Sequence, residues 1–233
     1  MTKLYTDTSA NLPLALLREY DIAVIPFSYT VNGVAEDYNE ETDFDGKAFY
    51  DAMRRGAEVK TSMVNPATAA AFFERALAQG DDVLYVGMSG GISGTAHAAA
   101  LAAEELREKY PRAKIMTIDT YAASLGEGLQ VLEAAELLRA EDDYLDGLAR
   151  SRLPDEGTRV PCGALRDAPE VLRTRMVRLL LERLGAGQRD FTAAHYEAMT
   201  ALALSEKDSL LHLPGGVRAE KRGDVWALRY APP

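Results

Sequence analysis

Three short segments rich in serine and threonine carry side chains that could bind a ligand. They are Thr61-Ser62, Ser89-Gly-Gly-Ile-Ser93-Gly94-Thr95, and Asp119-Thr120 through Ser124. Hydroxyls and free backbone N–H groups at such turns donate hydrogen bonds to an anion. None of the three segments contains lysine or arginine, which favours a singly charged carboxylate over a triphosphate. The competing interpretation is that each segment only caps a helix.

The elements around these segments predict a parallel α/β sheet. Strands are expected at 3–5, 22–30, 82–86 and 115–118, and helices at 12–20, 45–54, 66–78, 95–109 and from about 124. Asn65-Pro66 is typical of a helix start, and Asn32-Gly33 of a two-residue hairpin. Alternating strands and helices form parallel sheets, and ligands bind beyond the carboxyl ends of such strands. We therefore expect the three segments to share one edge of the sheet.

Charge changes near residue 140. Of the 233 residues, 26 are Lys or Arg and 36 are Asp or Glu. Residues 1–139 hold 12 basic and 21 acidic residues, whereas residues 140–233 hold 14 and 15. A net charge of −10 argues against a protein whose whole surface binds nucleic acid. The acidic run Asp37, Glu40, Glu41, Asp43 and Asp45 is interpreted as a solvated face, with a partner surface as the alternative.

The second part of the chain predicts a small α+β domain. A break at 153–161 precedes a helix at 170–184, opened by a capping box Asp167-x-x-Glu170 and closed by Gly185. A second helix is expected at 191–204. Three strands at 209–213, 217–221 and 225–230, joined by Pro-Gly-Gly and Arg-Gly-Asp turns, predict a β-meander.

No arrangement of residues predicts catalysis or a metal site. The histidines His97, His195 and His212 share no metal-ligand spacing, and Cys162 alone excludes a disulfide or a Cys-based zinc site. No nucleophile elbow occurs. No signal peptide or membrane-spanning window is found. We expect a cytoplasmic protein that is not an enzyme and that uses no metal or cofactor.

Several motifs occur in the order found in one family. They are Asp7-Thr-Ser-Ala-Asn-Leu-Pro13, Ile25-Pro26, Thr61-Ser62, Ser93-Gly94-Thr95 and Ser124-Leu-Gly-Glu-Gly128. Over residues 1 to about 135 the chain resembles the N-terminal part of DegV family proteins, bacterial fatty-acid-binding proteins of which some present the acyl chain to a fatty acid kinase. The resemblance implies that Thr61 and Ser93 bind a fatty acid carboxylate, with Ser62, Gly94 and Thr95 beside them. Two departures, Ser89-Gly90-Gly91-Ile92 for Ser-Ser-x-Leu and Met63-Val64 for Gln-Pro, could alter the turn shape.

A second resemblance begins at residue 135. The stretch 135–146, Leu172-Arg-Thr-Arg175, His195 and Leu213-Pro-Gly-Gly216 resemble the C-terminal, substrate-side domain of bacterial tRNA(Ile)-lysidine synthetases. This implies tRNA contact through Arg173, Arg175 and Arg178, for which a solvated helix face is the alternative. The ATP loop of that family, Ser-Gly-Gly-x-Asp-Ser, is approached by Ser89–Gly94. The loop here lacks the Asp and the second Ser, so we expect no ATP site.

The sequence therefore predicts a DegV-like domain at 1–138 and a synthetase-like accessory domain at 139–233. We expect only one domain from each family, because the second DegV domain and the synthetase catalytic domain are missing. We expect non-enzymatic binding of a long-chain fatty acid, impaired by the missing domain. The alternatives are a tRNA-binding accessory module and a fusion with neither activity intact. The change from one resemblance to the other within a single chain fits a natural fusion, a recombined or mis-assembled gene, or an engineered chimera.

Overall fold

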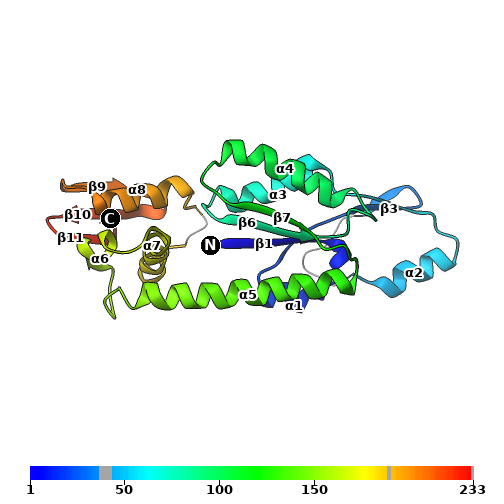
Figure 1. The fold of residues 1–233 in the computed structure, drawn as a ribbon, viewed down its shortest axis with the longest axis horizontal. Helices are drawn as coiled ribbons and strands as arrows, with labels where there is room; N and C mark the ends of the chain where they lie inside the picture. Colours follow the sequence, from blue (N-terminus) through cyan, green and yellow to red (C-terminus); the bar gives the residue numbers. More distant parts are fainter. Residues whose placement is uncertain (37–43, 188–189, 232–233) are drawn as a thin grey trace. The chain divides into compact units, whose positions relative to one another are not determined.

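The computed structural model describes residues 1–36, 44–187 and 190–231 (Figure 1). Its contacts divide the chain into two compact units. The first comprises Met1–Leu77 and Asp81–Arg139, and the second comprises Ala78–Gly80 and the residues from Ala140 onward. The division falls within helix α5 (Leu125–Arg150). Each unit has its own hydrophobic core and is described separately.

A four-stranded parallel sheet forms the centre of the first unit. Its strand order is β2-β1-β6-β7, and the strands are β1 (Thr2–Asp7), β2 (Ala23–Ile25), β6 (Asp82–Gly87) and β7 (Ile115–Asp119). Helices α3 (Pro66–Leu77) and α4 (Thr95–Lys109) cover one face, and α1 (Leu14–Glu19) with α5 covers the other (Figure 1). The predicted parallel α/β class is confirmed.

The core of this unit follows from the alternation of side chains along β1. Tyr5 packs with Phe73 and Tyr85 in the core beneath α3 and α4. Leu4 packs with Leu17 and Val131 in the core beneath α1 and α5. Successive residues of a strand point to opposite faces. The middle of β1 is therefore buried on both faces, by Leu4 on one and Tyr5 on the other, as is typical of parallel sheets.

A smaller antiparallel sheet has the order β4-β3-β5, formed by β3 (Ser28–Val31), β4 (Val34–Glu36) and β5 (Val59–Ser62). The strand predicted at 22–30 is in fact two strands in different sheets, because Pro26 lacks an N–H and interrupts the ladder. Thr61-Ser62 is the end of β5, paired with Tyr29 and Ser28, and not a turn. The Asn32-Gly33 hairpin is confirmed, with both residues at positive φ.

Helix α2 (Gly46–Arg54) follows the segment that contains the acidic run. Asp45 caps it by accepting a hydrogen bond from the Ala48 N–H at 2.9 Å. The remaining members of the run lie outside the described residues; they are Asp37, Glu40, Glu41 and Asp43. Asn65 caps α3 in the same way, accepting from the Thr68 N–H at 2.9 Å, as its position before Pro66 predicts.

The second unit combines three further helices with an antiparallel sheet. The helices are α6 (Cys162–Arg166), α7 (Glu170–Leu184) and α8 (Ala193–Leu204). The predicted meander is confirmed as β9 (Ser209–His212), β10 (Val217–Arg222) and β11 (Val225–Tyr230). A fourth strand, β8 (Arg159–Pro161), pairs with β11 where a break was predicted. Buried Val160 opposite Trp226 explains the addition, because core packing outweighs the flanking Pro and Gly.

Of the predicted ends of helix α7, the start at Asp167 is wrong and the end at Gly185 is confirmed. Asp167 ends α6, and Pro169 precedes α7 without a side-chain cap, so the predicted capping box at Asp167 is wrong. Proline at this position fixes an extended entry to the helix and leaves Asp167 outside it. Gly185 ends α7 in the left-handed conformation, as predicted, with φ of 74°. His195 caps α8, its Nδ1 accepting from the Thr192 N–H at 3.0 Å.

Candidate functional site

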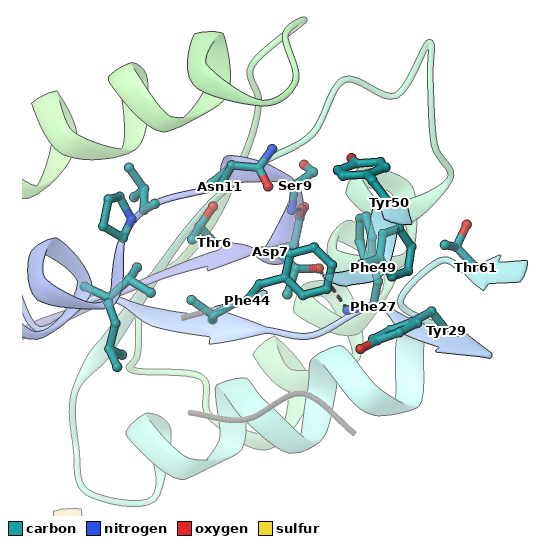
Figure 2. Close-up of a pocket in the computed structure, with 17 residues that line it drawn as sticks. Thr6, Asp7, Ser9, Asn11, Phe27, Tyr29, Phe44, Phe49, Tyr50 and Thr61 are labelled. Atoms are coloured by element: carbon teal, nitrogen blue, oxygen red, sulfur yellow. Dashed lines mark hydrogen bonds between the residues drawn. The ribbon is translucent and has the colours of Figure 1, made fainter. Parts of the chain in front are cut away.

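A cavity of about 650 Å³ lies in the first unit where β1 ends (Figure 2). Its polar side comes from the end of β1 and the 3-10 turn Thr8–Ala10 that follows. Its apolar side comes from α1, β2 and residues beside them, namely Leu12, Pro13, Leu14, Leu17, Val24 and Phe27. Among the described residues that line the cavity, none is Lys, Arg or His. The described lining therefore offers apolar surface, hydroxyl and amide groups and the Asp7 carboxyl group, without a cation.

Four aromatic rings form one wall of this cavity (Figure 2). Phe49 of α2 lies at the centre, with its ring centroid 5.1 Å from Phe44, 5.7 Å from Tyr29 and 5.3 Å from Tyr50. All three pairs have the edge-to-face geometry that aromatic rings prefer. Phe44 and Tyr50 remain 58% and 55% exposed. Sequence reasoning missed this wall, although Phe44, Phe49 and Tyr50 lie close together in the sequence, before and within α2.

Two buried carboxyl groups lie at the polar side, Asp7 in the cavity lining and Glu127 next to it. Asp7 accepts hydrogen bonds from the Ser9 N–H at 2.9 Å, the Tyr85 hydroxyl at 2.7 Å and the Met88 N–H at 3.2 Å. Glu127 of α5 accepts from the Thr6 hydroxyl at 3.3 Å and from the Ser9 hydroxyl. Both carboxyl groups are almost completely buried. Ser9 thus connects the two, with its N–H on Asp7 and its hydroxyl on Glu127.

Burial shifts the pKa values of Glu127 and of Tyr85, the phenol that donates to Asp7. Desolvation raises the pKa of Glu127 to about 7, and repulsion from Asp7 adds to the rise, while the hydrogen bonds from Ser9 and Thr6 oppose it. Desolvation likewise raises the pKa of the Tyr85 phenol well above its usual value, with Asp7 adding to it. Tyr85 therefore stays a neutral donor, and Glu127 changes its protonation near neutral pH. Sequence reasoning did not select either residue as part of a site.

The predicted ligand-binding segments converge at this end of the unit. A side chain at Gly94 would meet the Met63 sulfur, so the Ser93 turn approaches the residue after Thr61-Ser62. The Ser89 N–H donates to the Ala122 carbonyl at 2.8 Å. The Asn11 amide donates to the Ser124 hydroxyl at 3.0 Å. Segments far apart in the sequence are therefore held together beyond the carboxyl ends of β1, β6 and β7.

Strained backbone gathers at the same place. Asn11, Tyr121 and Ser124 have φ of 51°, 51° and 53°. Non-glycine residues adopt such angles at a cost, and they cluster at ligand sites and switches. The hydrogen bond between Asn11 and Ser124 joins two of them. The local conformation is thus imposed by the surrounding contacts rather than by local preference.

The individual residues predicted to bind a carboxylate have different environments. Thr61 is exposed and lines the cavity. Its neighbour Ser62 is also exposed, but it is the next residue along a strand and so faces the other way. The Ser93 hydroxyl lies 2.9 Å from that of Thr95, which is fully buried. The described lining includes Thr61 and none of the other four, Ser62, Ser93, Gly94 and Thr95.

Three arginines predicted to contact tRNA make internal contacts in the second unit. Arg175 of α7 is 8% exposed and pairs with Asp146 at 2.9 Å and with Asp142. The Arg173 guanidinium donates to three carbonyls, those of Leu165, Arg166 and Ala168. Arg178 lies over the ring of Tyr196, 4.8 Å from its centroid. These contacts point to packing roles, and tRNA contact through the three arginines stays a prediction.

The described ranges contain no group of three or more His, Cys, Asp or Glu side chains able to hold a metal ion. Within the same ranges, no helix has both the length and the apolar character needed to cross a membrane.

The geometry defines an α/β domain of the class that binds a ligand beyond the carboxyl edge of a parallel sheet. The family model of the uncharacterised DegV proteins matches residues 1–150, and the chain belongs to the DegV family. A family model of the substrate binding domain of TilS, the tRNA(Ile)-lysidine synthetase, matches residues 161–226. The resemblances drawn from the sequence motifs are therefore both confirmed.

Three relatives illustrate the similarity over the DegV part of the chain. A DegV domain-containing protein of Clostridium perfringens is 37% identical over 134 residues, 58% of this chain and 46% of its own. A DegV family protein from Thermus thermophilus, solved for its fatty acid binding, has 33% identity and a TM-score of 0.52, over 60% of this chain and 48% of its own. A Thermotoga maritima structure that reveals fatty acid binding function has 25% identity and a TM-score of 0.50, with coverage of 60% and 49%. The chain thus spans about half the length of the relatives it matches.

Glu127→Gln is expected to remove a pH dependence from the stability of the first unit. The folded state holds the pKa of Glu127 at about 7, above its ordinary value of 4.5, so it binds the proton more tightly than the unfolded chain does. The free energy of unfolding therefore falls as the pH rises from about 5 to 8, by up to roughly 3 kcal/mol. Calorimetry at pH 5 and pH 8 should show this fall reduced in the variant. The exposed Glu133→Gln serves as control, and equal pH dependence in all three proteins contradicts the prediction.

Proposed function

We propose that this chain binds a long-chain fatty acid without chemical conversion. Thr61 and Ser93 donate hydrogen bonds to the carboxylate, with Ser62 beside Thr61 at the end of β5 and Gly94 and Thr95 beside Ser93. The acyl chain lies in the cavity against the aromatic wall. The observation that carries the proposal is the cavity itself, a space of about 650 Å³ with an apolar lining and Thr61 at its wall. Ligand pockets in proteins commonly have 300–1,000 Å³.

The chemistry of the lining supports a fatty acid over a more highly charged ligand. Burial of an acyl chain contributes about 0.8 kcal/mol per methylene, so a long chain supplies most of the affinity. The polar end offers hydroxyls and backbone N–H groups and no cation among the described lining residues. A single carboxylate needs two or three such donors, whereas a triphosphate needs positive charge. The fatty acid binding of the Thermus and Thermotoga relatives supports the same ligand class.

We assign this binding to residues 1–138, and the remaining residues 139–233 to a separate domain. The chain spans about half the length of these DegV relatives. Presentation of the bound acyl chain to a fatty acid kinase is the partner interaction that the DegV resemblance suggests.

Lipid extraction from the purified full chain tests the proposal. Mass spectrometry should find a long-chain fatty acid in near-stoichiometric amount. The double variant Thr61→Ala and Ser93→Ala should retain less than about a tenth of it, because each lost hydrogen bond to a carboxylate costs about 1.5–3 kcal/mol. Ser209→Ala, an exposed serine of the second unit, is the matched control. A folded chain that carries no lipid and binds none when it is added contradicts the proposal.

A second candidate function is tRNA binding by the second unit, and the match to the TilS substrate binding domain favours it. Residues 140–233 are close to charge balance, unlike the acidic first part. Binding through phosphates would weaken steeply with salt. A gel shift of tRNA at low salt that is lost at high salt would support this function. Absence of a shift at low salt would contradict it.

A further inference from the structure

We propose that Glu127 is a positioning residue whose protonation frees the Ser9 hydroxyl to donate a hydrogen bond to a ligand carboxylate in the cavity. Ligand binding would then take up a proton. The inference rests on the proposed function and adds Ser9 as a third donor, beyond Thr61 and Ser93. It also predicts that the affinity for the fatty acid increases as the pH falls.

The first argument concerns hydrogen-bond direction. An ionised carboxylate can only accept, so the hydroxyls of Thr6 and Ser9 must both point their hydrogens at Glu127. Ser9 lines the cavity, but in this state its hydrogen points away from it. A protonated Glu127 can donate to the Ser9 oxygen instead. The Ser9 hydrogen is then free to turn toward the cavity, while its backbone N–H remains on Asp7.

The second argument concerns charge. Glu127 is completely buried, and the titratable groups that interact with it from the packed elements are Asp7 of β1 and Tyr85 of β6. Asp119 of β7 adds a further acidic group near Tyr85. Among the described residues, no basic group contributes to the pKa shift of Glu127. A third carboxylate brought into the cavity would meet less repulsion once Glu127 is neutral.

Both arguments predict that the ligand binds more tightly when Glu127 is protonated. Donor availability and reduced repulsion each favour the protonated form of Glu127 in the complex, so binding raises the affinity of Glu127 for its proton. The pKa of about 7 places this change near neutral pH. Affinity should be higher at pH 6 than at pH 8, with the change limited to about tenfold per pH unit by a single proton.

Fluorescence titration of the full chain with cis-parinaric acid, a C18 fatty acid, tests the inference at pH 6 and pH 8. The Kd of the wild type should rise by up to about tenfold between the two. Glu127→Gln, whose amide can donate to Ser9 at either pH, should show nearly equal Kd values, both close to the wild-type value at pH 6. Ser9→Ala should bind at pH 6 about as weakly as the wild type binds at pH 8. Circular dichroism at both pH values confirms that the variants are folded.

The outcomes separate this inference from the proposed function. A pH-independent Kd in the wild type, or the same pH dependence in Glu127→Gln, overturns the role of Glu127 and leaves fatty acid binding in place. Absence of binding at both pH values overturns both. Calorimetric titration at pH 7 in two buffers of different ionisation enthalpy gives an independent readout, and an absence of net proton uptake there overturns the inference.

Discussion

Replacing Gly87 with alanine is expected to lower the free energy of unfolding by about 3 kcal/mol. A Cβ atom at Gly87 would lie 2.0 Å from the Tyr85 hydroxyl oxygen and 2.2 Å from the ring carbon that bears it. Both distances are far below van der Waals contact. Tyr85 is completely buried and packs against Phe73, so its ring has no space into which to move. The substitution must break the hydrogen bond between Tyr85 and Asp7.

Loss of that hydrogen bond reaches the candidate site. The Tyr85 hydroxyl, at 2.7 Å from Asp7, is one of three donors that stabilise this buried carboxylate. With fewer donors, the turn after β1 that forms the polar side of the cavity loses its anchor. We therefore expect reduced lipid content together with a lower melting temperature in Gly87→Ala.

Differential scanning calorimetry measures this effect, and Gly147→Ala is the matched control. Gly147 lies within helix α5, and a Cβ there would meet no atom within 4 Å. Alanine is favoured over glycine in a helix by about 1 kcal/mol, so the control should be neutral or more stable. A melting temperature of Gly87→Ala equal to that of the wild type would contradict the argument from close contact.

Arg175→Ala is expected to destabilise the second unit by roughly 2–4 kcal/mol. The Arg175 guanidinium is almost fully buried and pairs with Asp142 and Asp146, which lie one turn apart on α5. Removal of the cation leaves two carboxylates facing each other without their partner. Removing one member of a buried ion pair costs more than the pair itself contributes.

This variant also distinguishes a packing role from a tRNA-binding role. Arg152→Ala, an exposed arginine of the same unit, should change the melting temperature by little. Arg175→Met, which keeps the apolar stem, should recover part of the packing but none of the pairing with Asp142 and Asp146. If Arg175→Ala kept full stability and lost only a salt-dependent tRNA shift, phosphate contact would be supported and the packing role would be wrong.

The sequence by itself determined those features that depend on neighbouring residues. The alternation of strand and helix predicted the parallel sheet, and the Asn32-Gly33 turn, the Asn65 cap and the Gly185 helix end are all confirmed. The β-meander was predicted from three short strands with clear turns and is confirmed as β9, β10 and β11. The two-part organisation was visible in motif order, and the family matches at 1–150 and 161–226 confirm it.

Tertiary structure decided what distant residues do together. Asp7 and Glu127 lie far apart in the sequence, and only the packing of α5 against β1 makes them a buried pair joined by Ser9. No spacing rule predicts such a contact, because it depends on the register between a strand and a helix. The same holds for Arg175, whose helix pattern fits a solvated face until α5 supplies two half-buried carboxylate partners.

Strand pairing also depends on distant residues, beyond what the local sequence predicts. Thr61-Ser62 is a polar pair typical of a turn, yet it forms the end of β5 because Tyr29 and Ser28 pair with it. β8 forms beside Pro and Gly because Val160 enters the core opposite Trp226. Local preference costs or gains about 1 kcal/mol per residue, whereas burial of a large side chain contributes 1.5–3 kcal/mol. Local sequence therefore predicted the elements, and long-range burial decided which residues form the cavity.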